Sequence, residues 1–299
     1  MQSLRAAIGD FKKQGKAIGH FNISDSNQLR ALALASMETK LPVIVGLSEG
    51  EREYFPISHA KALIDMYRSQ GVQLYLNADH TYGIEKAKKA IDDDVDSIVV
   101  DGAKLTMEEN IAFACEVVKH ARSKKSMFGG RDIIVEGELG YIGQSSSLHD
   151  ELPAGVSLEN LTKPEDATRL VKEAGLDCLA PAVGNVHGML KSAAEPRLHP
   201  DRVKAIADAT GVPLVLHGAS GNTEQDVTDC IKAGMAVVHI NTELRVLYRN
   251  SLRASLMSDE TTPYKFLSPS VEEMKMYVAE KLRLFAVGIL LHYLFCLFL

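Results

Sequence analysis

Cysteine is scarce in this sequence: the 299 residues include four, Cys115, Cys178, Cys230 and Cys296, and no CxxC pair. Sparse cysteines without paired spacing are atypical of a secreted chain held together by disulfides, and they fit a reducing compartment. Residues 1–16 contain no long apolar run, so we expect no signal peptide. These absences together predict a cytoplasmic protein.

Positive charge is also in deficit, with 33 Lys and Arg residues against 39 Asp and Glu residues and a formal net charge of −6. Because a nucleic-acid-binding domain needs a basic face, we expect no nucleic-acid partner. The hydrophobic fraction of 46% and the charged fraction of 24% are ordinary for globular proteins, which excludes intrinsic disorder and a multi-span membrane protein.

One segment departs from this ordinary composition. Residues 284–299 contain no Asp, Glu, Lys or Arg. A membrane-spanning helix needs about 20 apolar residues, so this shorter stretch does not predict a membrane span. Three interpretations remain open for it: a packing helix, an interface segment, or a departure from the natural sequence.

A Rossmann-type phosphate loop is missing, because no GxGxxG follows the first apolar run. Short apolar runs instead alternate with helical periodicity, which favours parallel strands joined by crossover helices. Eight such runs match the (β/α)8 number, at residues 17–23, 43–47, 73–77, 97–100, 132–138, 178–182, 213–217 and 237–241. Helical segments are expected at 26–39, 58–69, 84–92, 107–123, 163–173, 201–209 and 224–232. We therefore predict an α/β fold, a single (β/α)8 TIM barrel with extra C-terminal helices over residues 1–284, and an apolar tail over 285–299.

Polar side chains stand repeatedly where the predicted strands end. In a barrel these carboxyl ends converge on one rim, where active sites are built. His80, His187 and His217 stand at three of these ends, and three histidines with an open fourth position are typical of a catalytic zinc site. No HExxH motif supports this locally, so the metal prediction depends on the barrel. His20 lies within the first strand, and its role is ambiguous.

The carboxylates near these histidines allow more than one interpretation. Glu136 and Glu138 are two residues apart, so in a strand they point to the same side. Alternatively, Glu136 pairs with a lysine and only Glu138 reaches the rim. Asp79 and His80 are adjacent, so both reach one site only if the strand ends there and the chain turns, which Gly83 permits.

Glycine-rich strand ends predict an anion site. Residues 218–221 (GASG) follow the seventh run, and Asn241 and Thr242 follow the eighth. Loops after strands seven and eight are the usual phosphate site of this fold, although plain turn chemistry is the alternative. The long non-periodic stretch at 140–159 indicates a functional lid or a disordered loop.

Taken in order, these motifs resemble one known family. They are Gly19-His-Phe-Asn22, residues 42–50 (PVIVGLSEG), Ala78-Asp-His80, Val99-Val-Asp-Gly102, residues 135–140 (VEGELG), Asn185-Val-His-Gly188, residues 216–221 (LHGASG) and Asn241-Thr-Glu-Leu-Arg245. The set is similar to the class II, zinc-dependent ketose-bisphosphate aldolases, which include fructose-bisphosphate and tagatose-bisphosphate aldolases. The resemblance runs from about residue 1 to residue 284.

The resemblance implies specific roles. His80, His187 and His217 match the ligands of a catalytic Zn2+, and Asp79 matches the acid that exchanges a proton with the aldehyde oxygen. Asp101 and Glu138 match positions for a second or displaced cation, divalent or monovalent. The remaining matches bind the substrate and its phosphate: Asn22, Ser48, Gly188, Lys191, Gly218, Ala219, Ser220, Asn241 and Thr242. His239 replaces a substrate-contacting asparagine of the family, and it either bonds the same oxygen or adds a group to the metal site.

The implied reaction is the reversible cleavage of fructose 1,6-bisphosphate to dihydroxyacetone phosphate and glyceraldehyde 3-phosphate, with zinc stabilising the enediolate, in a homodimer or homotetramer. A tagatose-bisphosphate aldolase, another zinc-dependent barrel enzyme acting on a phosphorylated sugar, and a non-catalytic sugar-phosphate binder are the alternatives. Two departures bear on the substrate. Where the family often has Lys-Ile-Asn, this chain has Val237-Val-His239, and the loop acid of the family matches either Asp150 or Glu151.

Overall fold

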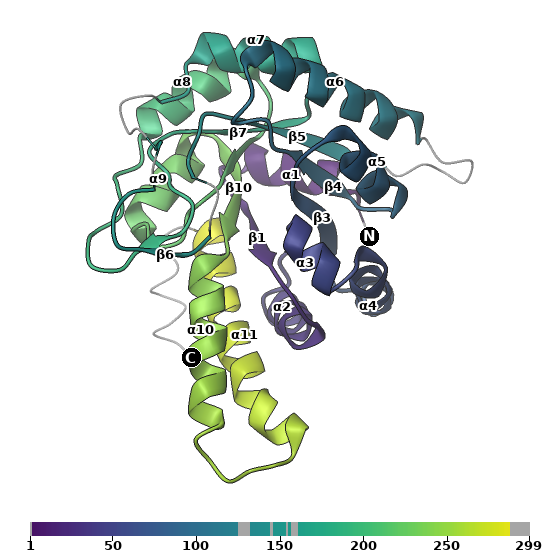
Figure 1. Cartoon of the computed structure of the whole chain (residues 1–299), viewed down its shortest axis with the longest axis vertical. Coiled ribbons are helices and arrows are strands. Elements are labelled where there is room, and N and C mark those ends of the chain that lie inside the picture. The colour runs from purple at the N-terminus through teal and green to yellow at the C-terminus, as the bar shows by residue number, and fades with distance from the viewer. Residues whose placement is uncertain (1, 125–131, 144–145, 154, 157–160, 288–299) are drawn as a thin grey trace.

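The computed structural model describes residues 2–124, 132–143, 146–153, 155–156 and 161–287 (Figure 1). Its parallel strands close a barrel in the order β1-β10-β9-β7-β5-β4-β3-β2. The strands are β1 (Ile18–Asn22), β2 (Val43–Leu47), β3 (Leu74–Thr81), β4 (Ser97–Val100), β5 (Ile134–Leu139), β7 (Cys178–Pro181), β9 (Leu214–Leu216) and β10 (Met235–Ile240). The predicted (β/α)8 barrel is therefore confirmed.

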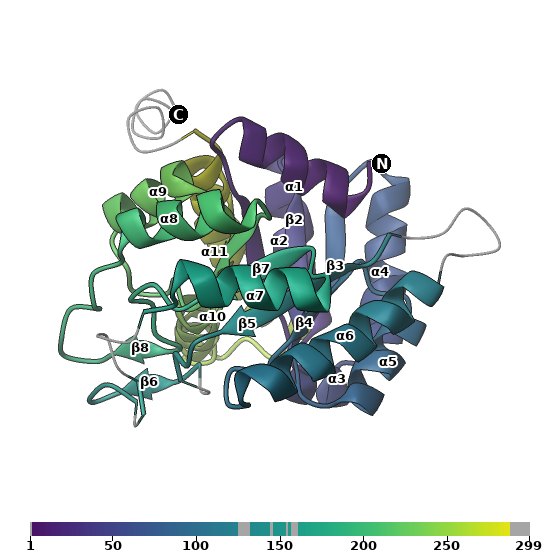
Figure 2. The same cartoon turned by 90° about the horizontal axis from the view of Figure 1, so that it is seen from above.

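The crossover helices surround this barrel (Figure 2). They are α2 (Ser26–Thr39), α3 (Glu49–Tyr54), α4 (Ile57–Ser69), α5 (Ile84–Asp92), α6 (Met107–Ser123), α7 (Pro164–Ala174), α8 (Pro200–Thr210) and α9 (Glu224–Ala233). Side-chain caps fix several of their starts: Asp25 accepts a hydrogen bond from the Gln28 N–H, and Thr106 forms a capping box with Glu109.

Helix α1 (Leu4–Lys13) was not among the predicted elements. Its buried face, Leu4, Ala7 and Ile8, packs in one apolar cluster with residues from the first halves of the strands, including Ile18 and Tyr75. This helix therefore closes the amino-terminal end of the barrel and leaves the opposite rim open for a site.

Strand β3 carries both Asp79 and His80, contrary to the expectation that the strand ends and turns there. It continues to Thr81, and its register against β4 shifts between Ala78 and Thr81. Within this irregularity His80 has a φ of +34°, in the left-handed region that is rare for residues other than glycine. A β-bulge, rather than a turn at Gly83, therefore brings the two neighbouring side chains to one site.

A small parallel sheet lies above the rim. It pairs β6 (Leu148–His149) with β8 (Met189–Leu190). The pairing joins the segment after β5 to the segment after β7, which carries His187. The predicted lid or disordered loop over 140–159 falls partly on residues 144–145, 154 and 157–160, which lie outside the described residues.

The last two helices, α10 (Thr242–Ser255) and α11 (Pro263–Val287), form an arm that projects from the barrel (Figure 1). Helix α11 returns along this arm and contacts α2 and β1. Leu284, Phe285 and Ala286 are buried in the core, so the uncharged segment begins inside the packed protein. Residues 288–299 lie outside the described part of the chain, and the division at residue 284 stays a prediction. No helix in the described part is long and apolar enough to cross a membrane.

Candidate metal and substrate site

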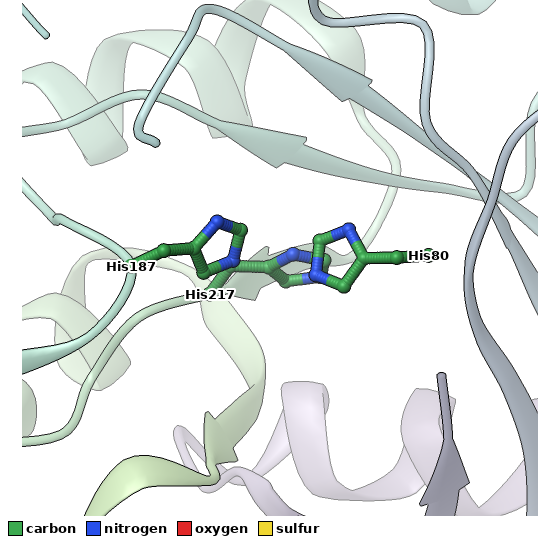
Figure 3. A group of neighbouring side chains, drawn as sticks. All are labelled: His80, His187 and His217. Atoms are coloured by element: carbon green, nitrogen blue, oxygen red, sulfur yellow. The ribbon is translucent and has the colours of Figure 1, made fainter. Parts of the chain in front are cut away.

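Three histidines from separate segments converge at the open rim (Figure 3). His80 lies on β3, His187 follows β7 and His217 follows β9. The ring centroid of His80 is 4.7 Å from that of His187 and 4.9 Å from that of His217. One potential ligand atom from each lies within 4.8 Å of the others, so the geometry brings together the predicted trio.

Each of these imidazoles has one nitrogen engaged by an oxygen acceptor. His80 Nδ1 is 2.9 Å from Asp101 Oδ2, His187 Nδ1 is 2.7 Å from the Gly143 carbonyl oxygen, and His217 Nε2 is 2.7 Å from Glu136 Oε1. When these nitrogens carry the protons, the opposite ring nitrogens keep their lone pairs. Ligating histidines are typically oriented in this way, so the three residues fit a bound metal ion.

Unpartnered oxygen and nitrogen atoms give an independent test of that fit. His217 Nδ1, Glu138 Oε2 and Asp79 Oδ1 are buried and have no hydrogen-bond partner among the described residues. Glu138 Oε2 lies 3.5 Å from His217 Nδ1 and 3.4 Å from His80 Nδ1. Buried groups of this kind are costly unless they are paired or hold a cation, so the donor set matches a metal centre.

The carboxylates take different places around the trio. Asp101 and Glu138 flank His80, and these three residues form a second group able to hold a cation. Glu136 pairs with His217, so the alternative that it pairs with a lysine is wrong. The sequence did indicate that Glu136 reaches the site, because Glu136 and Glu138 share one face of the strand β5.

Burial and charge set the protonation of the ring nitrogens. Burial disfavours the charged form of His80, but Asp79 and Asp101 raise its pKa to about 9. Burial lowers the pKa of His187 to about 3, with help from the charges of His80 and His217. The pKa of His217 is raised, because Glu136 and Glu138 outweigh its burial. The site therefore holds positive charge among its acids before any metal enters.

Asp79 is the predicted proton-transfer residue, and its two oxygens have different surroundings. Oδ2 accepts a hydrogen bond of 2.9 Å from Asn22 Nδ2. Oδ1 faces His239 Nδ1 at 3.7 Å and His80 Nε2 at 3.9 Å. Burial would raise the pKa of Asp79, but the charges of His80, His20 and His217 hold it below the ordinary value. Asp79 is therefore ionised at neutral pH, with one oxygen free.

His239 stands in the barrel interior beside this carboxylate and stacks on His20. The two residues are register partners on β10 and β1, and their rings lie 3.5 Å apart with an interplanar angle of 5°. Gly46 makes room for the stack, because a Cβ there would lie 2.2 Å from His20 Cε1. Burial and the neighbouring histidines lower the pKa of His239, so its ring is neutral at neutral pH. The role of His20 was ambiguous from the sequence. Its pairing with His239 places it in the barrel interior, stacked on the His239 ring.

A cleft between the metal residues and the strand ends gathers most of the predicted substrate residues. Its described lining is Asn22, Asp79, His80, Ser146, His187, Gly188, Gly218, Ser220, His239, Asn241 and Thr242. Ala219 is buried within the same loop, and its N–H donates to the His239 carbonyl oxygen. Gly218 has a φ of +60°, and a Cβ there would lie 2.3 Å from the Val186 carbonyl oxygen. Glycine is therefore needed for this close approach.

A second cleft continues from the first toward α3. Ser48, Glu49, Asn241 and Arg245 are among its lining residues. Ser48 begins α3 through a capping box with Glu51, and Glu51 also accepts hydrogen bonds from Asn22 and Arg245. Glu51 and Arg245 were not among the site residues predicted from the sequence. The S-x-x-E capping pattern at Ser48 was the available signal for Glu51.

Lys191 lies outside the described lining of both clefts. Its Nζ is 3.0 Å from Asp150 Oδ1, and the side chains are 44% and 81% exposed. Glu151 is exposed as well. The phosphate role of Lys191 and the choice of Asp150 or Glu151 as the loop acid therefore stay predictions.

Comparison with known proteins places this chain in a family. The family described as "Fructose-bisphosphate aldolase class-II" matches residues 2–288. The chain belongs to the class II fructose-bisphosphate aldolases. Members of this family are zinc-dependent lyases, so the predicted family and enzyme class are confirmed.

Individual relatives agree with this family over nearly the whole chain. A fructose-bisphosphate aldolase of Geobacillus stearothermophilus is 33% identical over 291 residues, covering 95% of this chain and 96% of the relative. One from Staphylococcus aureus (strain Mu50 / ATCC 700699) is 32% identical, covering 96% and 97%. The crystal structure of the YdjI aldolase from Escherichia coli K12 superposes with a TM-score of 0.80 at 28% identity, covering 96% and 97%.

Proposed function

We propose that this protein catalyses the reversible aldol cleavage of a ketose 1,6-bisphosphate, with fructose 1,6-bisphosphate as the first candidate. The products are dihydroxyacetone phosphate and glyceraldehyde 3-phosphate. The observation that carries the proposal is the trio of histidines, two buried and one half-buried, each with one nitrogen engaged, beside an aspartate with one oxygen that has no hydrogen bond. The names of the Geobacillus and Staphylococcus relatives support this choice of substrate.

We assign a zinc ion to His80, His187 and His217, because three protein ligands with an open position are typical of catalytic zinc. When bound, zinc supplies Lewis-acid polarisation of the substrate carbonyl and stabilises negative charge on its oxygen. Asp101 and Glu138 offer a place for a second or displaced cation beside His80.

Asp79 performs the proton transfer at the aldehyde end of the substrate. In cleavage, its free Oδ1 accepts the C4 hydroxyl proton, the C3–C4 bond breaks, and the electron pair passes to the ketone half as an enediolate. The loop acid, Asp150 or Glu151, then gives a proton to C3, which completes dihydroxyacetone phosphate. In condensation, Asp79 returns the proton to the aldehyde oxygen as the bond forms. Asn22 holds Oδ2, so that Oδ1 keeps its direction toward the site.

The loop after β9 and the start of α10 bind the phosphate of the ketone half. Gly218 and Ser220 of this loop line the cleft together with Asn241 and Thr242 at the start of α10, and Ser220 Oγ accepts a hydrogen bond from the Asn241 N–H. A helix N-terminus with free N–H groups favours an anion. Gly188 also lines this cleft, and glycine is needed there because a Cβ would lie 2.4 Å from the Ser147 carbonyl oxygen.

His239 motivates a second candidate, a tagatose-bisphosphate aldolase. The neutral imidazole occupies the position where the family often has asparagine, so it presents a wider group to the sugar. Fructose 1,6-bisphosphate and tagatose 1,6-bisphosphate differ in stereochemistry at C4, the carbon whose hydroxyl faces Asp79 in this proposal.

Cleavage of the two sugars by the zinc-loaded protein tests both candidates. Dihydroxyacetone phosphate is followed by its reduction with a coupling dehydrogenase, at matched substrate concentrations. A higher kcat/KM for fructose 1,6-bisphosphate supports the first candidate, and a higher value for tagatose 1,6-bisphosphate supports the second. Absence of cleavage with both sugars would reject the proposal in favour of a different zinc-dependent barrel enzyme or a sugar-phosphate binder.

A further inference from the structure

The C-terminal helix α11 contacts two elements next to the proposed phosphate loop. One is α9, which follows the loop in the chain, and the other is the first turn of α10, which accepts a hydrogen bond from the loop. Tyr277, half-buried on α11, donates its hydroxyl to Glu243 Oε2 in the first turn of α10. One turn later, Lys281 Nζ lies 3.5 Å from Glu224 Oε1, at the start of α9. Helix α11, which contributes no residue to the described lining of either cleft, therefore contacts α9, which follows residues 218–221, and the first turn of α10.

Glu243 links Tyr277 to the loop itself. Its other oxygen, Oε1, accepts a hydrogen bond of 2.9 Å from the Gly221 N–H. Gly221 has a φ of +83°, and a Cβ there would lie 2.7 Å from Glu195 Cγ. Because glycine is conformationally permissive, the Gly221 backbone depends on such a contact to hold one conformation, and the Glu243 hydrogen bond fixes where the loop ends.

Glu243 also brings negative charge to the edge of an anion site. A carboxylate beside a bound phosphate would repel it unless that charge is engaged elsewhere. The Tyr277 hydroxyl donates a hydrogen bond to Glu243 Oε2, the oxygen that does not bind the Gly221 N–H. Lys281 Nζ lies 5.4 Å from the centre of the Tyr277 ring and adds positive charge nearby. Burial and the Glu243 charge raise the pKa of Tyr277, so the hydroxyl keeps its proton and remains a donor.

We propose that Tyr277 is a positioning residue for the substrate phosphate, acting through Glu243 on the loop that ends at Gly221. This inference rests on the proposed function, because it takes residues 218–221 as the phosphate loop. It gives α11 a part in substrate binding without contact with the reacting atoms.

Binding of inorganic phosphate and steady-state cleavage of fructose 1,6-bisphosphate test the inference in the full-length, zinc-loaded protein. Loss of the hydrogen bond to the Glu243 carboxylate, transmitted in part to the loop, predicts that Tyr277→Phe raises the phosphate Kd and the KM by about 3- to 10-fold. The kcat of the variant should stay within about twofold, because bound substrate still meets an intact metal site. Tyr264→Phe, at a 71% exposed tyrosine earlier on α11, is the matched control and should change neither constant.

A double-mutant comparison separates action through Glu243 from a general packing effect. Glu243→Gln keeps an oxygen for the Gly221 N–H and removes the charge, so its phosphate affinity should equal or exceed that of the unmodified protein. In this background, Tyr277→Phe should change the phosphate Kd by less than about twofold. If the Tyr277→Phe variant does not fold, the Glu243→Gln variant tests the inference by itself. Weaker phosphate binding by Glu243→Gln than by the unmodified protein would contradict the inference.

The outcomes distinguish this inference from the proposed function. If the unmodified protein neither binds phosphate nor cleaves the sugar, the proposed function fails and this inference falls with it. If the unmodified protein does both, and Tyr277→Phe leaves the phosphate Kd unchanged or lowers kcat alone, the inference is overturned while the proposed function stands.

Discussion

At the scale of single residues, hydrogen-bond partners decide what each histidine can do. His80, His187 and His217 each have one nitrogen engaged by Asp101, by the Gly143 carbonyl or by Glu136. The other nitrogen of each ring can ligate a metal ion that displaces any proton it carries. The sequence predicted the three ligands from their strand-end positions, but it could not assign Glu136 to His217. That contact joins β5 to the end of β9, and it depends on how the barrel closes.

Replacement of Asp79 by asparagine tests the proton-transfer role. An amide cannot accept the hydroxyl proton, so we expect Asp79→Asn to lower kcat for cleavage by about 10²- to 10⁴-fold. Zinc content, measured by atomic emission, should stay near that of the unmodified protein. Asp208→Asn, on the exposed face of α8, is the control. Retention of more than half of kcat by Asp79→Asn would assign the proton transfer to another residue.

Glu136 gives a second test at this scale, because it orients a proposed ligand without facing the cleft. Loss of such a partner typically costs about 10- to 100-fold in metal affinity, so Glu136→Gln should weaken zinc binding by that factor. Competition with a chromophoric chelator measures the effect. Glu173→Gln, at an exposed glutamate that pairs with Arg169, should bind zinc normally. Equal affinity in both variants would show that Glu136 does not support His217.

At the scale of helices and strands, the pattern of apolar runs predicted the eight barrel strands with boundaries off by at most four residues. The expectation for β3 was wrong in its geometry, since a register shift and the strained backbone of His80 replace the expected turn. Nothing in the local sequence of Ala78-Asp-His80 specifies a bulge, because its cause is the pairing with β4. Helix α1 was overlooked, although Leu4, Ala7 and Ile8 already have helical spacing.

The overlooked helix supplies a stability prediction. Ile8 is 3% exposed and packs against the interior residues of the strands. Truncation of a buried isoleucine to alanine typically costs about 2–5 kcal/mol, so Ile8→Ala should lower the free energy of unfolding by that amount. Chemical denaturation measures this, with the exposed Lys13→Ala on the same helix as control. A loss below about 0.5 kcal/mol would mean that α1 does not seal the barrel.

At the scale of the whole molecule, one barrel concentrates its chemistry at one end. Helix α1 fills the amino-terminal opening with apolar side chains, and the carboxyl ends of the strands collect histidines, carboxylates and glycine-rich turns. The arm of α10 and α11 connects to this end through Glu243 and Tyr277. The cytoplasmic location, the homodimer or homotetramer and the role of residues 285–299 stay predictions, because they depend on surroundings that a single chain does not contain.

The central claim is that aldol cleavage at this site requires a metal held by His80, His187 and His217. Its most direct test is the rate of fructose 1,6-bisphosphate cleavage after complete metal removal by a chelator, followed by stepwise return of zinc. The account predicts loss of activity in the metal-free protein and full recovery at about one zinc per chain. Full cleavage by the metal-free protein, together with a lysine adduct trapped by borohydride, would contradict it.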